Sequence, residues 1–151
     1  MNIALGCDHA ALECKAEVAR VLAAAGHQVR DHGTHTAESC DYPDYAWQVA
    51  CAVAAGRCDL GILICGSGIG MAMAANKVAG VRAARCTTES EARLSRQHND
   101  ANVLCLGARL MDQDRLIKVT LEWLQTPFEG GRHQRRVDKL SRIEEGGDPR
   151  S

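Results

Sequence analysis

The segment that most constrains the fold runs from Asp59 to Ala75 and reads DLGILICGSGIGMAMAA. Its apolar run, 60–64, predicts a buried strand that ends at Cys65. Three glycines at alternate positions follow the cysteine, and the small residues after them predict a helix. A strand that enters a glycine-rich turn at a helix N-terminus leaves backbone N–H groups free to point at an anion. The segment therefore predicts an anion-binding turn with a thiol at its mouth.

A similar alternation of short apolar runs and helical patterns continues along most of the chain. Strands are expected at 2–7, 27–32, 80–85 and 102–106, and helices at 10–25, 43–55, 69–78, 88–97, 112–124 and in the polar segment after Pro127. Strands that alternate with helices indicate a parallel sheet with helices on both faces. Because ligands bind outside the carboxyl ends of such strands, we expect one edge of the sheet to carry the site. The segments that meet there are Cys7–His9, Cys65–Ser67, Arg85–Thr87 and Gly107–Arg109.

Length and charge exclude several classes of protein. The 151 residues suit one domain, expected at 1–145, before a tail at 146–151 that we expect to be disordered. A net charge of −1 gives no general attraction to nucleic acid or to a membrane surface. No apolar run reaches the roughly 18 residues of a transmembrane helix, and the N-terminus lacks the pattern of a secretory signal. We therefore expect a cytoplasmic protein.

The eight cysteines do not predict a cross-linked or zinc-bound fold. A chain of this length can build its own core, and no two cysteines stand at the CxxC spacing of a structural zinc site. Most of these thiols are expected to be small buried hydrophobic groups. For Cys40, Cys51 and Cys58 the sequence suggests no function.

The glycine-rich turn at 66–70 differs from two well-known phosphate-binding motifs. A dinucleotide-binding fingerprint needs its third glycine where this chain has Met71, and no Gly-Lys-Ser/Thr follows as in a P-loop. A tight turn alone would also select small residues. Three glycines in five positions exceed that need, which favours a cradle for an anion or an oxyanion. Cys65 is then either one more inert buried thiol or a thiolate stabilised by the helix N-terminus.

Other polar positions admit both a structural and a functional interpretation. Asp8 is either a helix cap or, with His9, part of a site at the end of the first strand. The segment 98–100 is either a capping turn or the source of a histidine for acid–base chemistry near neutral pH. Arg132 and Arg136 are four residues apart and share a helical face, which is either solvated or a phosphate clamp.

Five segments closely resemble the family of type B ribose-5-phosphate isomerases. They are GCDHAA at 6–11, DYP at 41–43, ICGSGIGMAMAANK at 64–77, LSRQHNDANVL at 94–104 and FEGGRHQRRV at 128–137. The family also includes allose-6-phosphate and galactose-6-phosphate isomerases, and the resemblance spans about residues 2–145. It implies a Rossmann-like three-layer α/β/α sandwich with a five-stranded parallel sheet. It also implies interconversion of ribose 5-phosphate and ribulose 5-phosphate in the non-oxidative pentose phosphate pathway, without a metal ion or cofactor.

Carried onto this sequence, the resemblance implies a role for each matching residue. Cys65 is the catalytic base; some family members instead use a glutamate further along the glycine-turn helix, where this chain has Ala74 and Ala75. His98 assists opening of the furanose ring, and Ser67, which stands where the family often has threonine, relays a proton. The remaining residues bind substrate: Asp8 and Asn99 at sugar hydroxyls, His9, Arg132, Arg136 and, from the partner subunit, Arg109 at the phosphate, Tyr42 as a pocket wall, and Gly66, Gly68, Ile69 and Gly70 through backbone N–H groups.

The resemblance also implies an assembly, namely a homodimer or homotetramer with active sites at the subunit interface that act on a small sugar phosphate. Two other functions stay open on the sequence alone. One is an isomerase of a six-carbon sugar phosphate such as allose 6-phosphate, which needs a longer pocket. The other is a non-catalytic sugar-phosphate sensor. The joint presence of Cys65, His98 and the arginines favours an enzyme over a sensor.

Overall fold

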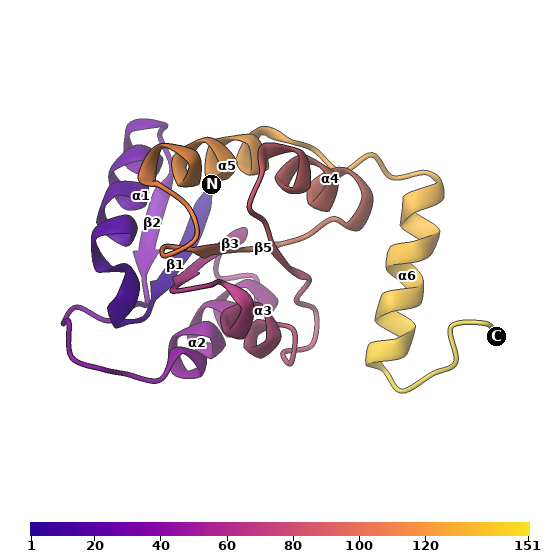
Figure 1. The fold of residues 1–151 in the computed structure, drawn as a ribbon. Helices are drawn as coiled ribbons and strands as arrows, with labels where there is room; N and C mark the ends of the chain where they lie inside the picture. The colour runs from indigo at the N-terminus through magenta and orange to yellow at the C-terminus, as the bar shows by residue number, and fades with distance from the viewer.

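Five parallel strands form one sheet in this computed structural model, which describes all 151 residues (Figure 1). The strands are β1 (Asn2–Cys7), β2 (Gln28–Asp31), β3 (Leu60–Cys65), β4 (Ala83–Arg85) and β5 (Val103–Gly107), in the order β2-β1-β3-β5-β4. The chain builds outward from β1 to β2 and then crosses to the other side of β1 to form β3. The boundary between β1 and β3 is therefore the topological switch point, where open parallel sheets bind ligands.

Helices cover both faces of the sheet (Figure 1). They are the short 3₁₀ helix η1 (His9–Ala11) and the α-helices α1 (Leu12–Ala24), α2 (Tyr42–Ala54), α3 (Ile69–Ala75), α4 (Glu89–Asn99), α5 (Gln113–Gln125) and α6 (Arg132–Glu144). One buried cluster packs α1, α4 and α5 on the sheet, and a second packs α2 and α3 on the opposite face. This is the three-layer α/β/α sandwich predicted from the sequence.

Residues of β3 alternate between the two cores, as the period of two in a strand requires. Ile62 and Ile64 face the α1–α4–α5 layer, whereas Leu63 and Cys65 face the α2–α3 layer. All six residues of β3 are buried, because the strand lies between β1 and β5 and is covered on both faces. The register aligns Cys65 with Gly107 of β5, so the ends of the two strands lie level.

The segment 76–82 is the largest departure from the predicted elements. The helix expected to reach Val78 ends at Ala75, and the strand expected from Gly80 begins at Ala83. Asn76 explains both differences, because its side-chain amide donates to the Ala83 carbonyl at 2.9 Å and accepts the Ala83 N–H at 2.8 Å. This pair of hydrogen bonds holds the intervening residues in a loop.

Helix α6 projects at one end of the molecule, where it contacts α4 (Figure 1). A cavity of about 620 Å³ separates the C-terminal half of α6 from the segment 76–84. Leu140 and Ile143 of α6 line this cavity and are 45% and 53% exposed. The Gly80 N–H donates to Glu144 Oε2 at 2.9 Å, which ties the end of the helix to the loop.

The tail at 146–151 turns back along α6, where Lys139 and Arg142 contact the carbonyl groups of Pro149 and Ser151. None of the helices in the structure is both long and apolar enough to cross a bilayer.

Candidate active site

The turn after β3 wraps around the sulfur of Cys65. The Gly68 N–H donates to Cys65 Sγ at 3.1 Å, and the Ile69 N–H donates to Ser67 Oγ at 3.2 Å. The backbone N–H groups of Gly66, Ser67 and Gly70 have no acceptor within the chain. A donor directed at the sulfur stabilises negative charge there. Of the N–H groups predicted to form an anion cradle, those of Gly68 and Ile69 are already engaged within the turn, so only Gly66, Ser67 and Gly70 keep free donors beside the sulfur.

Tyr42 and Arg109 flank this turn. A Cβ atom added to Gly70 would lie 2.5 Å from Tyr42 Cζ, and one added to Gly66 would lie 3.2 Å from Arg109 Nη1. Glycine at these two positions therefore lets the tyrosine ring and the guanidinium approach the backbone directly. Both side chains reach the turn from their own chain, Tyr42 from the start of α2 and Arg109 from the segment after β5.

Arg85, which the sequence placed on the ligand-binding edge of the sheet without assigning it a role, also contacts the turn. Its Nε donates to the Ser67 carbonyl oxygen at 2.9 Å. Its place at the carboxyl end of β4, on the same edge of the sheet as Cys65, agrees with that expectation.

Asp8 and His9 follow β1 and lie across the switch point from Cys65. The Asp8 N–H donates to the Ile64 carbonyl of β3 at 3.3 Å, and Asp8 Oδ1 accepts the Ala10 N–H at 3.0 Å. The capping interpretation of Asp8 is therefore confirmed, and its second carboxylate oxygen remains for a ligand. His9 Nδ1 accepts the backbone N–H of Cys40 at 3.2 Å. A neutral His9 ring then carries its proton on Nε2, which makes that nitrogen a donor.

The structure places His98 and Asn99 on the opposite edge of the sheet. They end α4, which runs antiparallel to the strands and returns the chain to the start of β5. Asn102, three residues further along the chain, accepts the N–H of Gly61 at the beginning of β3. Cys65 lies at the end of β3. Within one chain, therefore, the base and the ring-opening histidine implied by the resemblance are not brought together.

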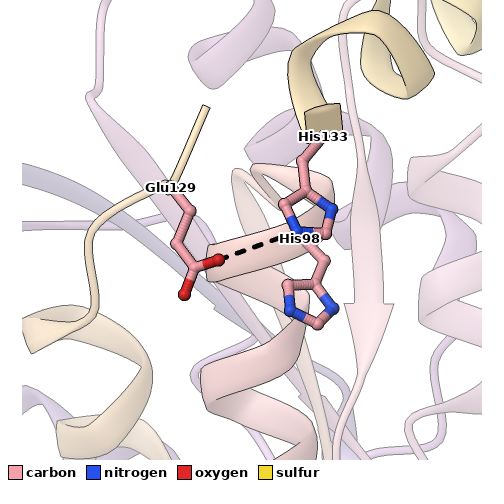
Figure 2. A group of neighbouring side chains, drawn as sticks. All are labelled: His98, Glu129 and His133. Atoms are coloured by element: carbon pink, nitrogen blue, oxygen red, sulfur yellow. Dashed lines mark ion pairs between the residues drawn. The ribbon is translucent and has the colours of Figure 1, made fainter. Parts of the chain in front are cut away.

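His98 belongs to a second group of polar side chains, shown in Figure 2. Its ring stacks on that of His133 in α6, with centroids 4.1 Å apart and planes 8° from parallel. His133 is 4% exposed, and its Nε2 lies 3.6 Å from Glu129 Oε2. Burial lowers the pKa of His133, and the neighbouring His98 and arginines lower it further. His133 is thus a neutral ring that supports His98.

Arg132 and Arg136 lie on α6 beside His133 and are exposed to solvent. Their helix stands at one end of the molecule, apart from β1, the strand that His9 follows (Figure 1). The resemblance implied that Arg109 reaches the phosphate from the partner subunit. In the structure Arg109 lies on the same edge of the sheet as His9 of its own chain. Ala108 and His9 line a common cavity there.

The predicted site residues therefore fall into two groups. The Cys65 edge comprises Asp8, His9, Tyr42, Cys65, the turn 66–70 and Arg109. The His98 edge comprises His98, Asn99, Arg132 and Arg136, together with Glu129 and His133, which the sequence did not single out. Three side chains of the His98 edge are of metal-ligating types and lie close together, namely His98, Glu129 and His133.

Comparison with known proteins gives one consistent result. Residues 3–140 match the family described as Ribose/Galactose Isomerase. Ribose-5-phosphate isomerase B of Escherichia coli (strain K12) is 49% identical over 144 residues, which are 95% of this chain and 97% of the relative. A solved ribose-5-phosphate isomerase B of Clostridium thermocellum has a TM-score of 0.95 and 49% identity, covering 97% of this chain and 99% of that one. The enzyme of Mycoplasma genitalium, solved with bound ribulose-5-phosphate, has a TM-score of 0.92 and 46% identity, covering 95% and 96%.

Proposed function

The chain belongs to the ribose/galactose isomerase family, and on that premise we propose that it interconverts D-ribose 5-phosphate and D-ribulose 5-phosphate. The observation that carries the proposal is the turn after β3, where a thiol that receives an N–H bond stands beside three unengaged N–H groups. An aldose–ketose isomerisation needs a base next to donors for an oxyanion. The relative solved with ribulose-5-phosphate supports this substrate.

The proposed chemistry moves one proton between two carbons. Cys65, as thiolate, removes the proton from C2 of the open-chain aldose, and the electron pair moves to the carbonyl oxygen to give a cis-enediolate. The same thiol returns the proton to C1. The N–H groups of Gly66, Ser67 and Gly70 would stabilise the oxyanion, with each well-placed donor contributing about 3–4 kcal/mol to lowering the barrier. The Ser67 hydroxyl, whose oxygen already accepts the Ile69 N–H, is free to pass its proton between O1 and O2.

We further propose that each complete site is built from two copies of the chain. The Cys65 edge of one copy supplies the base and the cradle, and the His98 edge of the other supplies ring opening. Two features support a dimer. The two groups lie on opposite edges of the sheet within one chain, and α6 projects with exposed Leu140 and Ile143 beside a cavity of about 620 Å³.

In such a dimer the phosphate would lie between the two edges. His9 and Arg109 approach it from one copy, and Arg132 and Arg136 from the α6 of the other. Guanidinium groups bind phosphate oxygens through paired N–H donors. Binding energy at the phosphate, remote from C1 and C2, would position the sugar for proton transfer. Asp8 and Asn99 would contact sugar hydroxyls, and Tyr42 would close the pocket.

We assign the reaction to the cytoplasm. All eight cysteines are free thiols in the structure. Thiols persist in the reducing cytoplasm, whereas secreted proteins tend to carry disulfides.

A coupled assay of purified protein tests the proposal. Ribose 5-phosphate and allose 6-phosphate are compared at equal concentrations, and kcat/KM is expected to favour the five-carbon sugar. A preference for allose 6-phosphate would assign the chain to the six-carbon branch of the family. No isomerase activity on either sugar, in protein that binds them, would identify a sensor.

A further inference from the structure

The His98 edge contains three side chains of the kind that bind transition metals. His98 comes from the end of α4, Glu129 from the segment between α5 and α6, and His133 from the first turn of α6. One ligand atom from each lies within 4.8 Å of the other two. Figure 2 shows the carboxylate of Glu129 directed at the pair of imidazole rings.

The chemistry of this set suits zinc. Two imidazoles and one carboxylate, with a fourth position for water, form a common zinc site with bonds of about 2.0–2.2 Å. In a tetrahedral site the ligand atoms are then roughly 3.3 Å apart. His133 Nε2 and Glu129 Oε2 are 3.6 Å apart, close to that separation.

His133 adds an independent observation that points to a ligand. The residue is 96% buried, and its Nε2 has no hydrogen-bond partner. A buried polar nitrogen without a partner is costly and calls for an explanation.

We propose that His98, Glu129 and His133 bind one divalent transition-metal ion of the zinc class. The ion takes no part in the isomerisation. Binding requires His98 to leave its stack on His133, because a metal lies in the plane of the imidazole that holds it, and two parallel rings cannot both point at one ion. His98 is half-buried at the end of α4, whereas His133 is held by the surrounding core. His98 is therefore the ring that turns.

On the proposed function, in which His98 opens the sugar ring, metal binding affects catalysis. An ion that holds His98 removes it from the sugar ring and adds positive charge beside the phosphate-binding arginines. The metal then acts as a reversible inhibitor that slows ring opening. Removal of the metal by a chelator restores the rate, because no covalent bond of the protein changes.

Metal binding is tested on the full-length protein after treatment with a chelator. Titration with Co²⁺, followed by its visible spectrum, and with Zn²⁺, followed by calorimetry, should give one ion per chain. Glu129→Gln and His133→Gln should each weaken binding by about tenfold or more, since even outer partners of a metal site change affinity by that factor. Glu129 is exposed, so its variant tests the site without disturbing the core.

Two controls distinguish this site from other side chains that could bind the metal. His35 lies 4.0 Å from Asp31 as an exposed histidine–carboxylate pair, and His35→Gln should leave affinity unchanged. The eight thiols are distinguished by the spectrum, because cobalt bound to sulfur gives an intense charge-transfer band that nitrogen and oxygen ligands lack. Such a band, or wild-type affinity in Glu129→Gln, would overturn the proposal.

An activity measurement tests the metal site and the ring-opening role of His98 separately. Zn²⁺ should inhibit wild-type isomerase reversibly, and Glu129→Gln should need about ten times more metal for the same fractional loss of its own rate. Binding at the site without inhibition would support the metal site and contradict the ring-opening role of His98. Inhibition that Glu129→Gln does not relieve would place the inhibitory ion elsewhere and overturn the proposal.

Discussion

The backbone N–H of Gly68 donates a hydrogen bond to the sulfur of Cys65, 3.1 Å away, in a turn that closes over the end of β3. The turn needs glycine at this position, because φ is +74° and a Cβ atom would lie 3.0 Å from the Leu106 carbonyl carbon. The left-handed conformation of Gly68 therefore determines whether its N–H can reach the sulfur of Cys65.

We expect Gly68→Ala to lower both stability and activity. The added methyl group meets the backbone of β5 in a left-handed conformation, a combination that costs about 1–3 kcal/mol of unfolding free energy. Urea denaturation and kcat measure the two effects. Gly56→Ala is the matched control, since Gly56 also has a positive φ of +66° but no heavy atom within 4 Å of the added Cβ. Equal losses in the two variants would mean that contact with Leu106 is unimportant.

Cys65→Ala should lose about 10²–10⁴-fold in kcat, the usual contribution of a general base. Affinity for the sugar phosphate should remain near that of the wild type, because the thiol itself is not one of the proposed phosphate contacts. Calorimetric titration with ribose 5-phosphate and a steady-state assay separate the two quantities. A variant with more than a tenth of wild-type kcat would exclude Cys65 as the base.

Mixing two inactive variants should restore activity if each site uses two copies of the chain. Cys65→Ala and His98→Asn damage opposite edges, so a mixed dimer carries one doubly damaged and one intact site. Random pairing should return about a quarter of the wild-type rate. Native mass spectrometry confirms that mixed dimers form. No recovery in their presence would contradict a shared site.

Arg136→Gln should raise KM for ribose 5-phosphate by roughly tenfold or more, because a hydrogen bond to a charged group contributes about 1.5–3 kcal/mol. Arg135→Gln is its control: the neighbouring arginine faces away from the side of α6 that buries His133 and Val137. A similar rise in KM for both variants would indicate a general charge effect rather than a phosphate contact.

Acid should destabilise the protein through His133. Burial lowers the pKa of His133 below its ordinary 6.5, so the unfolded chain binds this proton more readily than the folded one. The stabilising contribution is therefore present above about pH 6.5 and is lost as the pH falls through the lowered pKa. Denaturation at pH 7.5 and 5.5, at one protein concentration, should show a smaller loss for His133→Phe. His35→Gln should retain the wild-type difference; equal slopes in all three proteins would remove His133 as the cause.

The hydrophobic periodicity of the sequence was sufficient to predict the three layers of the fold. The continuous apolar run 60–64 predicts a strand covered on both faces, and β3 is one. The glycines after Cys65 predict unengaged N–H groups in the turn that leads into α3, where those of Gly66, Ser67 and Gly70 have no acceptor. These predictions succeed because strand and turn geometry depend on neighbouring residues. The end of α3 and the start of β4 could not be predicted in the same way. They depend on the hydrogen bonds between Asn76 and Ala83, which lie at opposite ends of a loop.

What the sequence by itself determined was the α/β alternation, the place of the thiol beside a glycine turn, and the family. Only the tertiary structure decided which of the site residues can meet. His98 lies on the edge of the sheet opposite Cys65 because its helix must run antiparallel to the strands it connects. Its ring stacks on that of His133, and the Cys40 N–H donates to His9; both contacts join residues more than 30 positions apart in the chain. Such contacts depend on how the chain packs rather than on local pattern, and no spacing in the sequence records them.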